Sequence, residues 1–309
     1  MATGLVYSPL FLAHRPVGYH PENEERLSRS VAHLQGAGLW ERVRHLEIAP
    51  ADEASLARLH TPEHIDRVRR IAGAGGGHSD PDTYLSGESF AAASLAAGGA
   101  CAAVEAVLGG EVENAFCLVR PPGHHARPAG PMGFCLFNNL ALAARHLQEE
   151  FGLERILVFD FDLHHGNGVQ DAFYRDPGVF YISLHKFPFF PGTGAAGERG
   201  DGRGRAFTLN IPLGWRISAE EYMEHFGAAL RRARDYRPQF VLLAAGFDAY
   251  TFDPIGNYCL EEHHYREITR RLRELATESC GGRLVSTLEG GYHPTHLPRL
   301  ITAHLEELL

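Results

Sequence analysis

The chain has 309 residues, 44% of them hydrophobic and 22% charged, which is typical of a globular protein with a large core. Its formal net charge of −9 argues against a general nucleic-acid-binding surface, which needs a basic patch. The five cysteines are an odd number without a C-x-x-C pair, so we expect a reducing cytoplasmic location rather than a disulfide framework.

The N-terminal half begins with a short predicted strand at Leu5–Tyr7. The stretch Met1–Arg15 has no basic leader and no long apolar run, so we expect no signal peptide. Apolar residues at helical spacing then predict helices over Pro21–Ala37, Ala54–His60 and Pro62–Ile71. The glycine-rich run Gly73–Asp82 predicts a loop.

Strands and helices alternate over the rest of the chain. The run Ala91–Gly110 contains Ser94 and Glu105 and predicts a tightly packed helix rather than a membrane span. The predicted strands are Asn114–Val119, Arg155–Asp160, Val179–Leu184, Phe207–Ile211, Phe240–Ala244 and Arg283–Leu288. The predicted helices are Glu88–Leu108, Asn138–Phe151, Ala219–Tyr236, Glu261–Glu278 and Pro298–Leu308. This order predicts one α/β domain over residues 1–309, with a mainly parallel sheet covered by helices.

The stretch Ile156–Gly168 joins a buried strand to a set of metal-ligating side chains. Its first half is apolar, and Asp160, Asp162 and His164 then follow at alternate positions. Unpaired charges in apolar surroundings cost several kcal/mol or more, and a divalent cation would offset that cost. A buried ion-pair network with an arginine or lysine from elsewhere in the chain is the alternative.

Three other predicted strands also run into reactive residues. They lead into R-P-P-G-H-H at 120–125, A-G-F-D at 245–248 and E-G-G-Y at 289–292. A parallel sheet brings the carboxyl ends of its strands to one edge, where α/β proteins place their sites. We therefore expect a single site assembled from four separate segments.

Residue chemistry suggests a role for each member of this set. Asp162, His164 and Asp248 could hold a catalytic zinc ion with a coordination position left open. His124 and His125 are candidate proton shuttles. The polar residues that could orient these two rings are Asp160 and Asn167, and the Tyr292 hydroxyl could donate to a developing oxyanion.

These roles have plainer alternatives. The two histidines could be turn residues that only bind backbone groups, Asp248 could cap a helix, and Tyr292 could be a core tyrosine. Metal-assisted hydrolysis of an amide is the chemistry that uses all of these residues together.

The ordered motifs resemble the zinc-dependent histone deacetylase superfamily, in particular its class II-like branch with bacterial deacetylase-like amidohydrolases. Besides the segments above, the match includes G-F-C-x-F-N-N at 133–139, S-L-H-K-x-P-F-F-P-G-T-G at 183–194 and L-E-G-G-Y at 288–292. It runs from His20 to Tyr292. The resemblance implies a three-layer arginase–deacetylase fold, with an eight-stranded parallel sheet between helices, and an enzyme that removes acyl groups from lysine-type ε-amides.

The resemblance also implies finer roles. Zinc falls on Asp162, His164 and Asp248, His124 pairs with Asp160, and His125, as the base, pairs with Asn167. The residues that fall on the substrate tunnel, its inner channel and its rim are Gly133, Phe134, Phe190, Arg26 and Asp82. Phe134 and Phe190 would be plain core residues without the motif. The residues that match a structural potassium site are Asp160, Asp162, His164, Ser183 and Leu184, and a second monovalent site is expected near Phe173 and Val179.

Substrate identity stays open between several possibilities. Polyamine-selective relatives have an acid where this chain has Ile255, which argues against a polyamine gate of that type. The chain could still act on small acetylated amines such as acetylpolyamines, or be an inactive acyl-lysine-binding protein. A manganese ureohydrolase would need a bridged two-metal carboxylate cluster, which these motifs do not supply. We expect no nucleic-acid or membrane partner, and a homo-oligomer is an open alternative.

Overall fold

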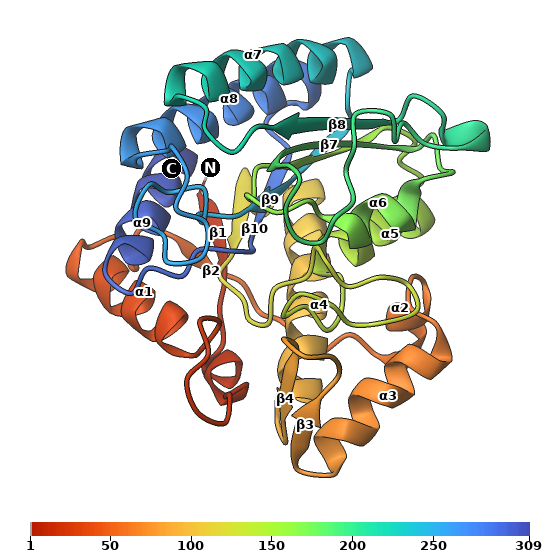
Figure 1. Ribbon diagram of the computed structural model, residues 1–309, viewed down its shortest axis with the longest axis vertical. Coiled ribbons are helices and arrows are strands. Elements are labelled where there is room, and N and C mark those ends of the chain that lie inside the picture. The colour runs from red at the N-terminus through yellow and green to blue at the C-terminus, as the bar shows by residue number, and fades with distance from the viewer. Residues whose placement is uncertain (1) are drawn as a thin grey trace.

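A computed structural model describes residues 2–309, and its central feature is an eight-stranded sheet (Figure 1). Every pair of neighbouring strands in this sheet is parallel, in the order β2-β1-β5-β10-β9-β6-β7-β8. The strands are β1 Thr3–Val6, β2 Arg44–His45, β5 Asn114–Cys117, β6 Ile156–Asp160, β7 Val179–Lys186, β8 Thr208–Leu213, β9 Phe240–Ala245 and β10 Leu284–Leu288. The predicted eight-stranded parallel sheet is therefore confirmed.

Helices cover both faces of the sheet, as predicted (Figure 1). On one side α4 contacts β1, β5 and β10, and α5 packs on α4, while on the other α7, α8 and α9 pack in sequence and α9 contacts α1. The helices are α1 Glu25–Gly36, α2 Glu53–Ala57, α3 Pro62–Gly73, α4 Ser89–Leu108, α5 Asn139–Phe151, α6 Asn167–Phe173, α7 Ala219–Tyr236, α8 Glu262–Cys280 and α9 His296–Leu308. Two short 3-10 turns lie at Pro9–Ala13 and Gly202–Gly204.

Helix α4 is long and apolar enough to cross a membrane, but 61% of its most apolar window is buried inside the protein. Its small residues allow close packing, because a Cβ at Gly98 would meet the backbone of Ala49 and Ala51. This contact supports the expectation of a packed core helix.

One local prediction was wrong, and one helix was not predicted. The predicted loop Gly73–Asp82 contains strand β3 (Gly76–His78), which pairs with β4 (Tyr84–Ser86) as a small antiparallel hairpin. Helix α6 begins at Asn167, in a segment where the sequence predicted no helix. Gly168 in its first turn allows a close contact, because a Cβ there would lie 2.8 Å from the carbonyl oxygen of His124.

A buried ion-pair cluster ties the N-terminal segment to the end of β5. The Arg120 guanidinium, fully buried, donates to the carbonyl oxygens of Phe11 and His14 and pairs with the Glu22 carboxylate. Glu22 also accepts from Arg26 Nη1 at 3.1 Å and from the Tyr84 hydroxyl at 2.9 Å. Burial raises the pKa of Glu22, but the charge of Arg120 outweighs it and holds the pKa well below its usual range.

We predict that Glu22→Gln lowers the free energy of unfolding by about 3–5 kcal/mol, because it leaves the buried Arg120 charge without its counter-charge. The control is Glu25→Gln, which breaks the exposed pair with Arg29 and should cost about 0–1 kcal/mol. Urea unfolding of both variants measures the difference. Equal losses would show that the buried cluster does not carry this stability.

Candidate metal centre and its surroundings

The ends of β6 and β9 bring Asp162, His164 and Asp248 together as a buried triad. One possible ligand atom from each residue lies within 4.8 Å of the others. His164 Nδ1 is 2.7 Å from Asp248 Oδ2 and 3.2 Å from Asp162 Oδ1. Asp248 Oδ2 is fully buried, and its short contact with His164 Nδ1 lacks the geometry of a hydrogen bond.

Backbone amides hold both carboxylates in place. Asp162 Oδ2 accepts from the Gly290 amide at 2.8 Å, and Asp248 Oδ1 accepts from the Leu163 amide at 2.9 Å. A Cβ at Gly290 would lie 2.6 Å from a carboxylate oxygen of either aspartate. Gly290, the first glycine of E-G-G-Y, is therefore required for this close approach.

The donor set fits a zinc ion. Two carboxylates and one imidazole are ligands that zinc takes in catalytic sites, which keep a further position open. Burial, and then the charge of Asp162, raises the pKa of Asp248 to about 7. Burial lowers the pKa of His164, but the carboxylates outweigh it and raise the pKa to about 10. The site has an excess of buried negative charge, which a divalent cation would offset.

The adjacent histidines have the two partners expected from the sequence. His124 Nδ1 donates to Asp160 Oδ2 at 3.1 Å, and His125 Nδ1 donates to Asn167 Oδ1 at 2.8 Å. Tyr181 also donates to Asp160 Oδ2, at 2.9 Å. Because Nδ1 of His125 carries the proton, its Nε2 is the nitrogen with a free lone pair.

The two histidines differ in charge. Burial lowers the pKa of His124, but the charges of Asp162 and Asp160 raise it to about 10. Burial, together with the neighbouring His124 and His164, lowers the pKa of His125 well below its usual range. At neutral pH these opposite pKa shifts favour an imidazolium at His124 and a neutral imidazole at His125 in the metal-free protein.

Tyr292 follows β10 and lies beside the triad. The Arg26 guanidinium is 5.0 Å from the centre of its ring, and the Phe134 ring meets it edge-on at 5.9 Å. Arg26 Nε also donates to the Gly291 carbonyl oxygen at 2.7 Å. Burial raises the pKa of Tyr292 well above its usual range, so its hydroxyl keeps its proton.

The structure brings the predicted tunnel residues to the same place. A Cβ at Gly133 would lie 2.5 Å from His125 Cδ2 and 3.0 Å from the Phe190 ring, in a backbone conformation with φ of +56°. The Phe190 ring meets His125 edge-on at 5.1 Å and is 36% exposed, as befits a residue at the mouth of a site. Phe134 packs edge-on against His20 at 4.7 Å.

Asp82 lines a neighbouring pocket of about 760 Å³ that also includes Asp80, Met132 and Phe190. Burial, followed by its contact with Asp80, raises the pKa of Asp82 to about 6. Ile255, half-buried, lies in the loop after Asp248, where its amide donates to Asp253.

The residues predicted to bind potassium lie on β6, β7 and the segment after β6. Asp160 and Ser183 are direct partners across β6 and β7, and Leu184 is the next residue. The Ser183 hydroxyl contacts His185 Nδ1 at 2.8 Å. Phe173 ends α6 and Val179 begins β7, so the second expected site lies at that connection. Both potassium sites stay predictions.

Sequence reasoning gave no role to two buried carboxylates, Glu289 and Asp253. Glu289 Oε2 accepts from the amides of Gly123 and His124, at 2.7 and 3.0 Å. Asp253 Oδ2 accepts from the Tyr292 amide at 2.7 Å. Glu289 lies inside the motif E-G-G-Y, and Asp253 lies shortly after A-G-F-D. Only the folded structure shows which backbone amides these two carboxylates bind.

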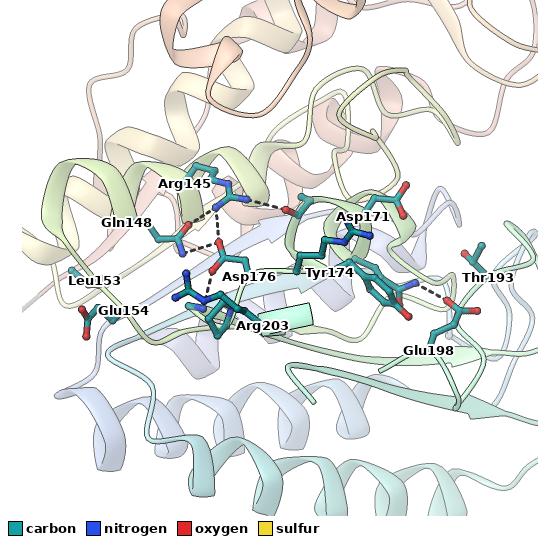
Figure 2. A pocket seen from close by; sticks show the side chains of 15 residues that line it. Arg145, Gln148, Leu153, Glu154, Asp171, Tyr174, Asp176, Thr193, Glu198 and Arg203 are labelled. Carbon is teal, nitrogen blue, oxygen red and sulfur yellow. Dashed lines mark hydrogen bonds and ion pairs between the residues drawn. The ribbon is translucent and has the colours of Figure 1, made fainter. Parts of the chain in front are cut away.

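A pocket of about 1270 Å³, larger than the one beside Phe190, lies away from the triad, between α5, α6 and the segment around Glu198 (Figure 2). Several of its charged groups form ion pairs, Arg145 with Asp176, Asp171 with Arg127 and Arg175 with Asp201. Arg145 Nη1 donates to Asp176 at 2.5 Å, and Gln148 Nε2 donates to the same carboxylate at 3.1 Å (Figure 2). Size alone therefore does not locate the reactive centre of this protein.

Comparison with known proteins finds relatives over nearly the whole chain. The model of the family described as "Histone deacetylase domain" matches residues 20–308. A "Probable deacetylase" of Archaeoglobus fulgidus is 40% identical over 295 residues, which cover 94% of this chain and 82% of the relative. A "Histone deacetylase-like amidohydrolase" of Pseudomonas aeruginosa is 39% identical over 291 residues, covering 94% and 77%.

The solved structure of the HDA15 HD domain aligns with a TM-score of 0.94 and 35% sequence identity. The alignment covers 100% of this chain and 89% of that one. This match confirms the arginase–deacetylase fold expected from the sequence.

We predict that Asp248→Ala abolishes stoichiometric zinc binding, because it removes one of three ligands and leaves His164 without its nearest carboxylate. The control is Asp176→Ala, which removes a carboxylate paired with Arg145 outside the triad. Elemental analysis after dialysis against a weak chelator measures the bound metal. A fully loaded Asp248 variant would refute this ligand set.

Proposed function

The chain belongs to the histone deacetylase family and is a deacetylase, and on that premise we propose that it uses one zinc ion to hydrolyse lysine-type ε-amides, releasing acetyl or other acyl groups. The observation that carries the proposal is the buried triad Asp162, His164 and Asp248, with the His125 ring centre 6.0 Å from that of His164. An inactive acyl-lysine-binding protein would have no need of this set.

Zinc held by the triad would polarise the amide carbonyl and favour attack by water. His125 Nε2 has the free lone pair that a general base needs, and Asn167 fixes its tautomer through Nδ1. The same imidazole can then return the proton to the departing amine. Its low pKa keeps it unprotonated before the reaction.

His124 supports the reaction by charge and position. Asp160 holds its ring through Nδ1, and Glu289 holds its backbone amide. We assign His124 to electrostatic stabilisation of the charge that develops on the carbonyl oxygen. Zinc bound to Asp162 would lower the pKa of His124 below its metal-free value, because it adds positive charge next to the same carboxylate.

Tyr292 supplies the hydrogen bond that forms only as the oxyanion develops. Its hydroxyl keeps its proton at neutral pH, and its ring is held between Arg26 and Phe134. Phe134 and Phe190 would contact the alkyl stem of the substrate, while Gly133 leaves room for it beside His125.

Potassium at Asp160 and Ser183, with the backbone of Asp162, His164 and Leu184, is part of the proposal. A monovalent cation there would offset the Asp160 carboxylate, which is fully buried at the end of β6. The five cysteines, all unpaired, support a cytoplasmic location.

The second candidate function is deacetylation of small amines such as acetylpolyamines. Asp80 and Asp82 in the pocket beside Phe190 favour it, because their carboxylates suit a cationic substrate. Ile255 argues against it, since it offers no charge to a distal ammonium group. Rates for acetyl-lysine peptides, longer acyl-lysines and acetylpolyamines, measured on one zinc-loaded preparation, decide between the two functions.

We predict that Tyr292→Phe lowers kcat by about 10²–10³-fold with little change in KM, because the lost hydrogen bond forms only in the transition state. Zinc content and melting temperature should not change. The control is Tyr236→Phe in α7, which should be as active as the unmodified enzyme. Near-normal turnover of the Tyr292 variant would remove this residue from the mechanism.

We also predict that Gly133→Ala lowers kcat/KM by about 10²-fold, since a Cβ there would collide with His125 and displace it. Gly130→Ala is the matched control in the same segment, because a Cβ at Gly130 meets nothing within 4 Å. Steady-state kinetics on the two variants should differ by at least about tenfold, and equal activities would contradict the predicted contact.

A further inference from the structure

We propose that Asp253 is a positioning residue for Tyr292, acting through a hydrogen bond to the Tyr292 backbone rather than through any contact with substrate. The inference rests on the proposed role of Tyr292. Asp253 lies in the connection between β9 and α8, five residues after the triad member Asp248. Only 2% of its surface is exposed, so its carboxylate has lost nearly all contact with water.

The two carboxylate oxygens of Asp253 have separate tasks. Oδ1 accepts from the amides of Ile255 and Gly256, both at 2.9 Å, and so closes the turn at the start of its own loop. Oδ2 reaches to a different strand end and accepts from the Tyr292 amide at 2.7 Å. Charge-assisted bonds of this kind are short and are stronger than neutral ones.

The turn that Asp253 closes also lies against the metal centre. A Cβ at Gly256 would collide with the Asp248 carbonyl oxygen and lie 2.8 Å from the Leu163 side chain. Asp253 therefore joins the loop that carries a metal ligand to the segment that carries Tyr292. Those two groups come from separate strands, so their relative position depends on contacts of this kind.

Arg26 holds the same segment from the opposite direction. It donates to the carbonyl oxygens of Gly291 and Glu289, at 2.7 and 2.5 Å, and lies over the Tyr292 ring. The peptide unit between Gly291 and Tyr292 is thus bound at its oxygen by Arg26 and at its nitrogen by Asp253. These two contacts fix the orientation of the peptide unit and therefore the direction of the Tyr292 Cα–Cβ bond. The position of the Tyr292 hydroxyl depends on that direction.

The variant Asp253→Asn separates the two tasks. An asparagine carbonyl in place of Oδ1 can still accept from Ile255 and Gly256, which keeps the turn closed. The asparagine NH2 group then faces the Tyr292 amide, and two donors cannot bond each other. The substitution therefore breaks the contact with Tyr292 while leaving the loop around Asp248 in place.

We expect Asp253→Asn to lower kcat by about tenfold with less than about a twofold change in KM, since misplacement affects the transition state more than substrate binding. Zinc content should stay equal to that of the unmodified enzyme. Asp52→Asn is the control, because it makes the same chemical change at a carboxylate that caps α2 far from the site. It should leave the kinetics unchanged.

The decisive test is a double-mutant cycle with Tyr292→Phe. If Asp253 acts through the Tyr292 hydroxyl, Asp253→Asn should lower the remaining activity of Tyr292→Phe by less than about twofold. An additional loss of about tenfold in that background would overturn the inference, because it would show a purely structural role. A crystal structure of zinc-loaded Asp253→Asn should show the Tyr292 hydroxyl displaced, and an unmoved hydroxyl would also overturn it.

The cycle distinguishes this inference from the proposed function. Full activity of Tyr292→Phe would defeat the assigned role of the tyrosine. An impaired Tyr292→Phe together with a fully active Asp253→Asn would defeat only the positioning role of Asp253.

Discussion

The organisation of this protein depends on excess negative charge at one edge of a parallel sheet. Asp160, Asp162, Asp248 and Glu289 are all fully buried there. The imidazoles of His124 and His164 offset part of this charge, and backbone amides stabilise individual oxygens. Carboxylates buried at this density are stable only with cations beside them, which is the physical reason for a metal at this edge.

Several buried charged side chains at this edge of the sheet bind backbone groups rather than other side chains. Glu289 accepts hydrogen bonds from the backbone amides of Gly123 and His124, and Asp253 accepts one from the Tyr292 amide. Arg26 donates to the backbone carbonyl oxygens of Glu289 and Gly291. The Glu22–Arg120 cluster in turn holds Arg26 and the N-terminal segment to the end of β5. The reacting groups are thus supported by a surrounding layer of buried charged side chains, as precise placement requires.

The surroundings of His124 and His125 also explain why these two histidines differ in charge. They are adjacent in the chain and their ring centres are 4.0 Å apart, yet their charges differ. The carboxylates of Asp162 and Asp160 stabilise a cation on His124, whereas the neutral Asn167 does not offset the burial and the neighbouring imidazoles that lower the pKa of His125. A carboxylate partner for one ring and an amide partner for the other therefore contribute to the opposite pKa shifts of these neighbouring side chains.

The sequence by itself determined the parallel sheet and the strand ends that bear reactive groups, and the resemblance of its motifs to a known family implied the pairing of His124 with Asp160 and His125 with Asn167. Apolar periodicity and motif order carry that information along the chain. It did not reveal the β3–β4 hairpin, helix α6, or what Glu289 and Asp253 bind. Glycine-rich segments are compatible with several backbone conformations, so α6 depended on the contact of Gly168 with the His124 segment. The partners of Glu289 and Asp253 are backbone amides 166 and 39 residues away, and only tertiary folding brings such groups within hydrogen-bond distance.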